Sequence, residues 1–538
     1  MLITIAALLT PLALCLVAAS PTFLGQSARS FATRAIAGAT ASFALALLMA
    51  GGVGIWGPAR SPLVGYGGIG MSIHVDALSS IMLVLVSFVG LAVIRYSRNY
   101  LDGDPGHRRF TRLLLLALAS VEALIISGNL ALLILAFVAT SLALNKLLLF
   151  YSERPAAKRA AAKKFVTSRL SDLCLVIASG LLYAHFGTLE IPDLITAARD
   201  NGAAYASWSL TLAALLIVTT AMLKSAQLPL HGWLLEVMET PTPVSALLHA
   251  GIINAGGFLV LRLADVLLLA TPALEVLAVI GGATALIASL VMLTQNAIKV
   301  QLAWSTIAQM GFMLLQCGLG AFSSALLHIV AHSLYKAHAF LSSGSIMDLA
   351  RASWTPSPGG QPHPARLVVS LAAVVGLTLA VGWVFGITPR SNLAQIALGC
   401  VLLMGLVHLV ANAIDERPNT FVISRAALLA AAVAGIYFVL QAVMEVIVAK
   451  SVPLGRMADG AVELAIAALV VVSFGAVTVF QNQMMRQADA PFWIAAYVHL
   501  KNGLYLNTLS NRLVLAFWPS SPNPLAPELQ KRRTAPCP

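Results

Sequence analysis

Residues 221–251 read AMLKSAQLPLHGWLLEVMETPTPVSALLHAG, and this stretch decides the fold. It continues an apolar run that begins near residue 208, so Lys224 lies inside a hydrophobic segment. Pro229 follows in the same segment. Because proline has no amide hydrogen and its ring clashes with the preceding turn, we expect the helix to break just beyond the lysine. A lysine beside such a break is typical of a proton-relay group, and the alternative is a lysine that snorkels from a helix end.

The whole chain has the composition of a polytopic membrane protein. Of its 538 residues, 59% are hydrophobic and 10% are charged, against roughly 25% charged in soluble domains, and the mean hydropathy is +0.88. Apolar runs of about 20 residues recur almost end to end and leave no room for a water-soluble core. We expect an all-α bundle of about 15 transmembrane helices, and not an enzyme. The predicted spans are residues 2–22, 35–55, 73–94, 112–128, 129–151, 165–185, 208–235, 243–263, 275–294, 301–318, 322–341, 366–388, 392–413, 424–449 and 460–482.

The cysteines argue against a metal centre or another cofactor on this chain. The five are scattered, without a C-x-x-C or C-x-x-C-H motif and without a His/Cys cluster at zinc spacing. The sequence therefore predicts no iron–sulfur, haem or structural zinc site. The cysteines are Cys15, Cys174, Cys317, Cys400 and Cys537.

The basic residues predict the orientation in the membrane. The net charge of +12 comes mainly from short loops between apolar runs, and the positive-inside rule places such loops in the cytoplasm. An odd number of spans then puts the N-terminus outside and the C-terminus in the cytoplasm of a bacterial plasma membrane. The loop residues are Arg29, Arg34, Arg95, Arg98, Arg108, Arg109, Arg112, Arg154, Lys158, Arg159, Lys163, Lys164 and Arg169, and the tail adds Lys531, Arg532 and Arg533.

Further ionisable side chains lie in the apolar runs, where each charge costs at least about 2.5–3.5 kcal/mol at mid-bilayer. Asp172 is a candidate counter-charge for Lys224, although Arg169 one turn earlier could neutralise it locally. His249 lies among small residues and could relay protons or bond across helices. Lys299 is close to a span boundary and could be interfacial.

Three titratable groups follow one another on a single predicted helix. His328, His332 and Lys336 stand at i, i+4 and i+8, which keeps them near one face over roughly 12 Å. This spacing predicts a hydrogen-bonded wire along the bilayer normal. Metal binding by the histidine pair is the alternative, but no carboxylate lies nearby in sequence and no H-E-x-x-H motif is present.

Three motifs, LKSAQLPLHGWLLEVMETPTPVSALLHAG, NAIKVQLAWSTIAQMGFM and HSLYKAHAFL, resemble the proton-conducting membrane family shared by the antiporter-like subunits of respiratory complex I and the Mrp cation/proton antiporters. The resemblance runs from about residue 73 to about 345. It implies two inverted five-helix repeats, here at about 73–415, with broken helices and a polar axis. The axis residues that it implies are Lys224, His249, Lys299, His328, His332 and Lys336.

The sequence departs from this family at the partner of the broken-helix lysine. Family members carry a W-E-x-x-G core in the fifth span, whose glutamate pairs with that lysine, whereas residues 129–151 have Val138 at this position. Asp172 and Glu122 are the candidates to replace it. Downstream, the family's second broken helix is not recognisable in VVGLTLAVGWVFGITPR, residues 374–390.

The C-terminal stretch YVHLKNGLYLNTLSNRLVLAFWP resembles the DabB membrane subunits of DAB-type inorganic carbon accumulation complexes, a divergent branch of the family. This resemblance implies a large peripheral partner (DabA-like), similar to β-carbonic anhydrases and containing the zinc. It also implies that ion flow through this chain drives conversion of CO₂ to bicarbonate. We expect a transmembrane domain at 1–490, an interfacial or partner-binding amphipathic segment at 491–518, and a disordered tail at 519–538.

Three other functions stay open from the sequence. The chain could be a membrane subunit of an NADH-quinone oxidoreductase, an Mrp-type antiporter or a structural anchor. Retained intramembrane lysines and histidines argue against an anchor, because a mere anchor would gain by exchanging them for apolar residues. The sequence does not distinguish H⁺ from Na⁺ as the transported ion.

Overall fold

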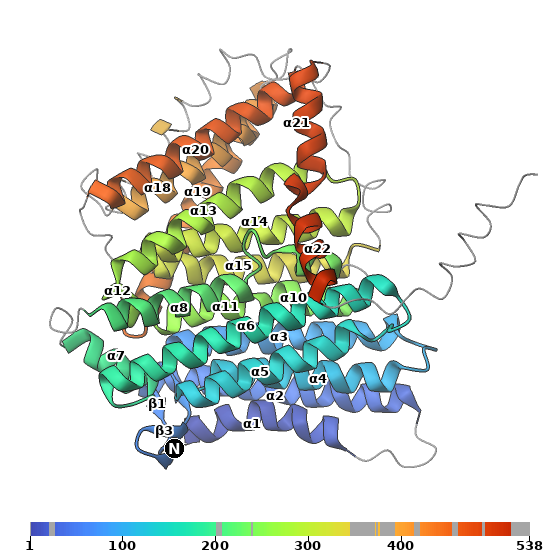
Figure 1. Ribbon diagram of the computed structural model, residues 1–538, viewed down its shortest axis with the longest axis vertical. Coiled ribbons are helices and arrows are strands. Elements are labelled where there is room, and N and C mark those ends of the chain that lie inside the picture. Colours follow the sequence, from blue (N-terminus) through green and yellow to red (C-terminus); the bar gives the residue numbers. More distant parts are fainter. Residues whose placement is uncertain are drawn as a thin grey trace, which may run out of the picture.

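The computed structural model describes residues 2–20, 27–200, 207–237, 240–344, 393–413, 420–453, 461–486 and 490–517, with a few single positions between 372 and 383. Long helices lie side by side, and the chain moves along the longest axis from α1 at one end to α18, α19 and α20 at the other (Figure 1). The predicted all-α class is confirmed. The expected span at 366–388 and the tail at 519–538 lie outside the described residues.

The first seven helices carry four short strands at one end of the bundle (Figure 1). The sequence pattern does not predict these strands, because each has only two or three residues and shows no alternation. They pair antiparallel, β1 with β4 and β2 with β3. The elements are α1 (Leu2–Ala19), α2 (Ala28–Trp56), β1 (Ala59–Arg60), β2 (Val64–Tyr66), β3 (Ile69–Met71), β4 (His74–Val75), α3 (Ala77–Tyr100), α4 (His107–Ile125), α5 (Leu130–Leu148), α6 (Pro155–Phe186) and α7 (Ile191–Asp200).

The break predicted beyond Lys224 is confirmed. Helix α8 (Trp208–Lys224) ends at the lysine, and α9 (Gly232–Glu236) starts only after Pro229. A second break, which the sequence does not predict, separates α10 (Thr242–Ala250) from α11 (Ala255–Arg262), with η3 (Ile252–Asn254) between them. The Asn254 amide donates to the Ala250 carbonyl at 3.0 Å and to the Ser333 hydroxyl at 2.8 Å. The first bond re-satisfies a backbone carbonyl that the break exposes, and the second ties the break to Ser333.

The remaining helices complete the bundle and then turn across it. Helices α21 and α22 run crosswise to the long helices (Figure 1). The expected single amphipathic segment at 491–518 is therefore two helices joined by a short turn. The elements are α12 (Ala264–Leu268), α13 (Thr271–Leu293), α14 (Ile298–Gly318), α15 (Phe322–Leu341), α18 (Leu393–Ala413), α19 (Thr420–Val448), α20 (Ala461–Arg486), α21 (Pro491–Lys501), η4 (Gly503–Tyr505) and α22 (Leu506–Phe517).

Within the described residues, eight helices are long and apolar enough to cross a membrane. They are α1, α2, α3, α5, α13 and α19, together with residues 156–186 of α6 and the broken segment 242–262. Helices α14 and α15 have similar lengths, 21 and 20 residues, but carry the predicted lysines and histidines. The structure therefore has the character of a multi-pass membrane protein, with its polar residues concentrated in a few helices.

The prediction that Lys163 and Lys164 are loop residues is wrong. Helix α6 begins at Pro155, and its alanine-rich first turns favour helix beyond the apolar run. The two lysines are only 2% and 4% exposed. The other residues assigned to loops but found in helices are Arg95 and Arg98 of α3, Arg108, Arg109 and Arg112 of α4, and Lys158, Arg159 and Arg169 of α6, while Arg29 and Arg34 belong to α2.

Helices α13 and α14 pack backbone against backbone through glycines. A Cβ atom built on Gly311 would lie 2.7 Å from the Gly281 carbonyl oxygen. A Cβ on Gly318 would lie 2.4 Å from the Ala278 nitrogen. Small residues at such contacts let membrane helices approach closely and gain dispersion energy. This contact fixes α14 beside the broken helices.

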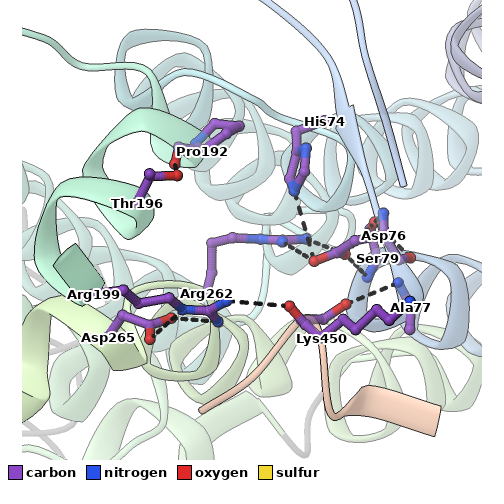
Figure 2. A network of polar contacts seen from close by, with 11 residues as sticks. His74, Asp76, Ala77, Ser79, Pro192, Thr196, Arg199, Arg262, Asp265 and Lys450 are labelled. Carbon is purple, nitrogen blue, oxygen red and sulfur yellow. Dashed lines mark hydrogen bonds and ion pairs between the residues drawn. The ribbon is translucent and has the colours of Figure 1, made fainter. Parts of the chain in front are cut away.

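A buried ion pair holds the end of the bundle that carries the strands (Figure 2). Asp76 caps α3, because its Oδ1 accepts a hydrogen bond from the Ser79 nitrogen at 2.9 Å. Arg262, at the end of α11, donates to both Asp76 carboxylate oxygens at 2.8 and 3.2 Å. Burial, the largest single effect, would raise the pKa of Asp76, but the charges and hydrogen bonds of Arg262 and His74 together outweigh it and hold that pKa well below its usual range.

A second ion pair lies beside the first (Figure 2). Arg199 of α7 donates to both Asp265 oxygens at 2.8 and 3.1 Å, and to the Lys450 carbonyl at 3.5 Å. The hydrogen bond to Asp265 raises the pKa of Arg199 above its ordinary value. These contacts connect α7, α12 and the turn after α19, which are far apart in sequence.

We expect Asp76→Ala to lower the free energy of unfolding by about 3–5 kcal/mol, because Arg262 would stay buried without its counter-charge. The matched control is Asp193→Ala, which removes an ion pair with Arg60 whose side chains are 50% and 66% exposed. That change should cost at most about 1 kcal/mol. Unfolding in detergent micelles measures both values, and equal losses would contradict the role of the buried pair.

The pH dependence of this contribution follows from the lowered pKa of Asp76. A carboxyl whose pKa is lower in the folded state stabilises the fold fully above its unfolded pKa, and the stabilisation is lost as pH falls through the folded pKa. The stability difference between the parent and Asp76→Ala should therefore stay constant from about pH 8 to about pH 5 and shrink only in stronger acid.

Candidate functional site

Lys224 and Asp172 form a buried ion pair at the break between α8 and α9. Lys224 is 7% exposed, and its Nζ donates to Asp172 Oδ1 at 2.8 Å. The other oxygen of Asp172 lies 2.7 Å from Arg169 Nη2. The two pairings that the sequence left open are thus both present, and one carboxylate serves two cations.

Side chains of α5 complete the surroundings of Lys224. The ammonium lies 4.8 Å from the centroid of the Phe137 ring. Phe137 and Thr140 line a small cavity of about 20 Å³ together with Lys224 and Lys164. Val138, where the related family has its glutamate, is half-buried and does not line this cavity. The counter-charge therefore comes from α6 instead of α5.

His249 stands at the second break, in the last turn of α10. Its side chain is fully buried, and its Nδ1 is 3.0 Å from the Thr306 hydroxyl of α14. The ring stacks on Phe340 of α15 with 4.4 Å between centroids. The imidazole therefore joins three helices, α10, α14 and α15.

The three titratable groups of α15 lie along one face, as their spacing predicts. The rings of His328 and His332 are 6.0 Å apart. His332 reaches the backbone of His249, and Lys336 donates to the Leu302 carbonyl at 3.1 Å and to the Ser305 hydroxyl. The described residues offer no hydrogen bond to Nε2 of any of the three histidines, His249, His328 and His332. Each of these nitrogens can therefore take part in proton transfer through water.

Two predicted site residues lie apart from this axis. Glu122 of α4 is fully buried, but its carboxylate accepts a hydrogen bond from Ser42 of α2 at 2.8 Å and does not contact Lys224. Lys299 is half-buried in the first turn of α14. Among the parts of the chain that are described, no group of three His, Cys, Asp or Glu side chains could hold a metal ion.

Sequence reasoning missed a polar cluster next to Lys224. Lys163 Nζ lies 2.7 Å from Glu236 Oε1 of α9. Lys164 Nζ lies 3.7 Å from the centroid of the Trp233 ring. The sequence does contain a signal for this cluster, because Lys164 and Asp172 are eight residues apart and would lie near one face of a helix. Assigning Lys164 to a loop removed that signal from consideration.

A second polar cluster, also missed, lies at the other end of α15. Gln441 of α19 donates to the Ser323 hydroxyl and to Glu445 Oε1, each at 3.0 Å. Ser323 is in the first turn of α15, one and a half turns before His328. Because five residues of an α-helix turn through roughly 500°, Ser323 faces another side of α15 than His328, and this cluster is separate from the histidine face.

A double-mutant cycle tests the pairing at Lys224. We expect Asp172→Asn to lower the free energy of unfolding by about 3–5 kcal/mol, because Lys224 and Arg169 both lose their counter-charge. Lys224→Met should cost less, since Arg169 still pairs with Asp172. The double variant should be at least about 1 kcal/mol more stable than the sum of the two single losses in unfolding free energy predicts. Titration with a denaturing detergent in mixed micelles gives the values, and additivity would show that the pair does not interact.

Two family models match the chain. The model described as NADH:quinone oxidoreductase/Mrp antiporter, transmembrane region, matches residues 127–353. The model of the N-terminus of chain 5 of NADH-ubiquinone oxidoreductase (complex I) matches residues 64–111. The first match contains both helix breaks and the whole of α14 and α15.

Individual proteins agree with these models. The chain is 40% identical over 458 residues to the probable inorganic carbon transporter subunit DabB2 of Halothiobacillus neapolitanus, covering 85% of this chain and 82% of that protein. It is 43% identical over 316 residues to the probable inorganic carbon transporter subunit DabB of Hydrogenovibrio crunogenus, covering 57% of this chain and 60% of that one.

A solved structure supports the fold. The Mrp complex from Dietzia sp. matches with a TM-score of 0.62 and 21% identity, over 99% of this chain and 62% of that chain. At this identity the likeness shows the fold alone, which is that of an antiporter-like bundle. The family itself is shown by the 40% identity to the DabB2 subunit over most of this chain's length. This chain therefore belongs to the family of DabB inorganic carbon transporter subunits, which are multi-pass membrane proteins related to the antiporter-like subunits of complex I and to the Mrp antiporters.

Proposed function

We propose that this chain is the proton-translocating membrane subunit of an inorganic carbon accumulation complex. Proton flow through it would drive the hydration of CO₂ to bicarbonate in a peripheral, zinc-containing, carbonic-anhydrase-like partner (DabA-like). The observation that carries the proposal is the buried Lys224–Asp172 pair at a helix break, close to an axis of buried histidines and Lys336. The names of the relatives supply the substrate class.

The chemistry of the axis favours H⁺ over Na⁺. Sodium sites are built from carboxylate and carbonyl oxygens, whereas Lys224 and Lys336 carry ammonium groups that repel a bare cation. Both oxygens of Asp172 already face cations, Lys224 and Arg169, and its single negative charge leaves this group of three with a net positive charge. Lysine and histidine side chains can instead pass a proton between them.

Arg169 gives the Lys224 pair a way to release its proton. While Asp172 Oδ1 accepts from Lys224 at 2.8 Å, the ammonium is stabilised. When Asp172 turns fully toward Arg169, Lys224 loses that partner and its charged form becomes less favourable. The proton can then pass through water to His249, on to His332 beside it, and to Lys336.

Coupling between the ion path and the partner must be reciprocal, so that hydration in the partner also shifts the state of the path. We place the partner on the cytoplasmic side, at the crosswise helices α21 and α22 (Figure 1). Their exposed apolar side chains suit a protein contact, since Phe492, Ile494 and Leu509 are 68%, 51% and 55% exposed.

We expect Lys224→Ala and Lys336→Ala to abolish inorganic carbon accumulation while the complex still assembles, because both remove a titratable group from the axis. Accumulation of labelled inorganic carbon by cells supplied with CO₂ measures the activity, and copurification of the partner measures assembly. The matched control is Lys146→Ala, an exposed lysine in the last turn of α5, which should leave uptake unchanged. Full uptake in either axis variant would remove the proposed path.

A further inference from the structure

One ammonium group ties the C-terminal segment to the broken helix. Lys163 of α6 is 2% exposed. Its Nζ lies 2.7 Å from Glu236 Oε1 of α9 and 2.8 Å from Asn507 Oδ1 of α22. Three elements from distant parts of the sequence therefore meet at Lys163.

The C-terminal segment lies against the bundle at two glycines. A Cβ atom on Gly232, the first residue of α9, would stand only 2.1 Å from Asn507 Oδ1. Gly503 has a φ of 58°, and a Cβ there would be 2.9 Å from the Trp304 ring. Gln295 adds a hydrogen bond of 3.2 Å to the Lys501 carbonyl. A few specific contacts therefore hold the segment in place.

Helix α9 separates this segment from the Lys224 site. Trp233 of α9 is 1% exposed, and its ring covers the ammonium of Lys164 at 3.7 Å. Lys164 and Lys224 line the same cavity of about 20 Å³, which has room for about one water molecule. Their charges interact across it. Moving α9 would therefore open this cavity to the face on which α22 lies.

The length of α9 makes it a movable element. It has five residues between the break that contains Pro229 and the turn at Pro241. A helix this short has no stability of its own and keeps its place only through its neighbours. Gly232 of α9 lies against Asn507. Glu236 of α9 binds Lys163, which also binds Asn507.

We propose that α9 is a gate between the Lys164–Lys224 cavity and the face that carries the C-terminal segment, and that this segment holds the gate closed through Asn507. The inference rests on the proposed function in one respect, namely that the ion passing the gate is H⁺. With the gate open, water reaches Lys164. A Lys164 ammonium then gives a proton to the bridging water while that water gives a proton to the neutral Lys224 amine, so that charge and protons balance.

Thiol labelling inside the cavity tests the gate without any measurement of transport. Thr140 lines the cavity and is 4% exposed, so Thr140→Cys in an otherwise cysteine-free chain reports on its accessibility. A small anionic methanethiosulfonate should label the parent slowly. We expect Asn507→Ala to speed labelling at least about tenfold, the order expected for losing one hydrogen bond to a charged group.

A second variant and a matched control make the test specific. Gly232→Ala should also speed labelling, because its methyl group would displace Asn507. Asn502→Ala is the control, since the Asn502 amide donates within its own segment, to the Val498 carbonyl at 2.8 Å. Labelling at the parent rate in both Asn507→Ala and Gly232→Ala overturns the gate, and so does faster labelling in Asn502→Ala.

The two proposals fail in different ways. Full carbon accumulation in Lys224→Ala would remove the proposed function and leave the labelling result standing, because labelling requires no ion flow. Unchanged labelling with lost accumulation in Lys224→Ala would remove the gate alone.

Discussion

The carboxylate of Asp172 is the constraint on which the site depends. It is 7% exposed and faces two cations, Lys224 and Arg169, at 2.8 and 2.7 Å. Leaving Lys224 without its counter-charge in the low-dielectric bundle would cost several kcal/mol, so α6 and α8 must stay in register. Sharing one carboxylate also makes the pair switchable, because the negative charge can move toward Arg169 without leaving the site. A permanent one-to-one pair would stabilise the bundle but would hold the Lys224 proton.

In the proposed path, the two helix breaks connect this ion pair to its neighbours. In straight helices every backbone group would be hydrogen-bonded within its own helix, and no free polar group would link the lysine to its neighbours for proton transfer. The break at 225–231 ends α8 at Lys224, and the break after Ala250 ends α10 at His249. Asn254 and Thr306 then satisfy the exposed groups and orient the imidazole. The glycine contact between α13 and α14 holds this arrangement from the other side.

The two ends of the bundle are closed by different means. At the end with the strands, Arg262 and Asp76 form a buried, bidentate ion pair between α11 and the start of α3, which suits a rigid closure. At the end near α9, closure depends on Lys163, Glu236 and Asn507, contributed by three elements, one of which has five residues. In the proposed gate, the end near α9 is the one that opens.

The sequence by itself determined the fold class, the break beyond Lys224 and the one-sided spacing of the α15 groups, because apolar run length, proline and helical periodicity act locally. It also put Asp172 among the candidate partners of Lys224, since one carboxylate in an apolar run is conspicuous. Only the tertiary structure decided for Asp172 over Glu122, because that choice depends on which helices lie side by side. It also moved Lys163 and Lys164 from a loop into the bundle, revealed the break at Gly251 and brought Asn507 to Lys163, 344 positions away in the chain. Charge and hydropathy along the chain carry no information on such contacts, because the packing of distant helices creates them.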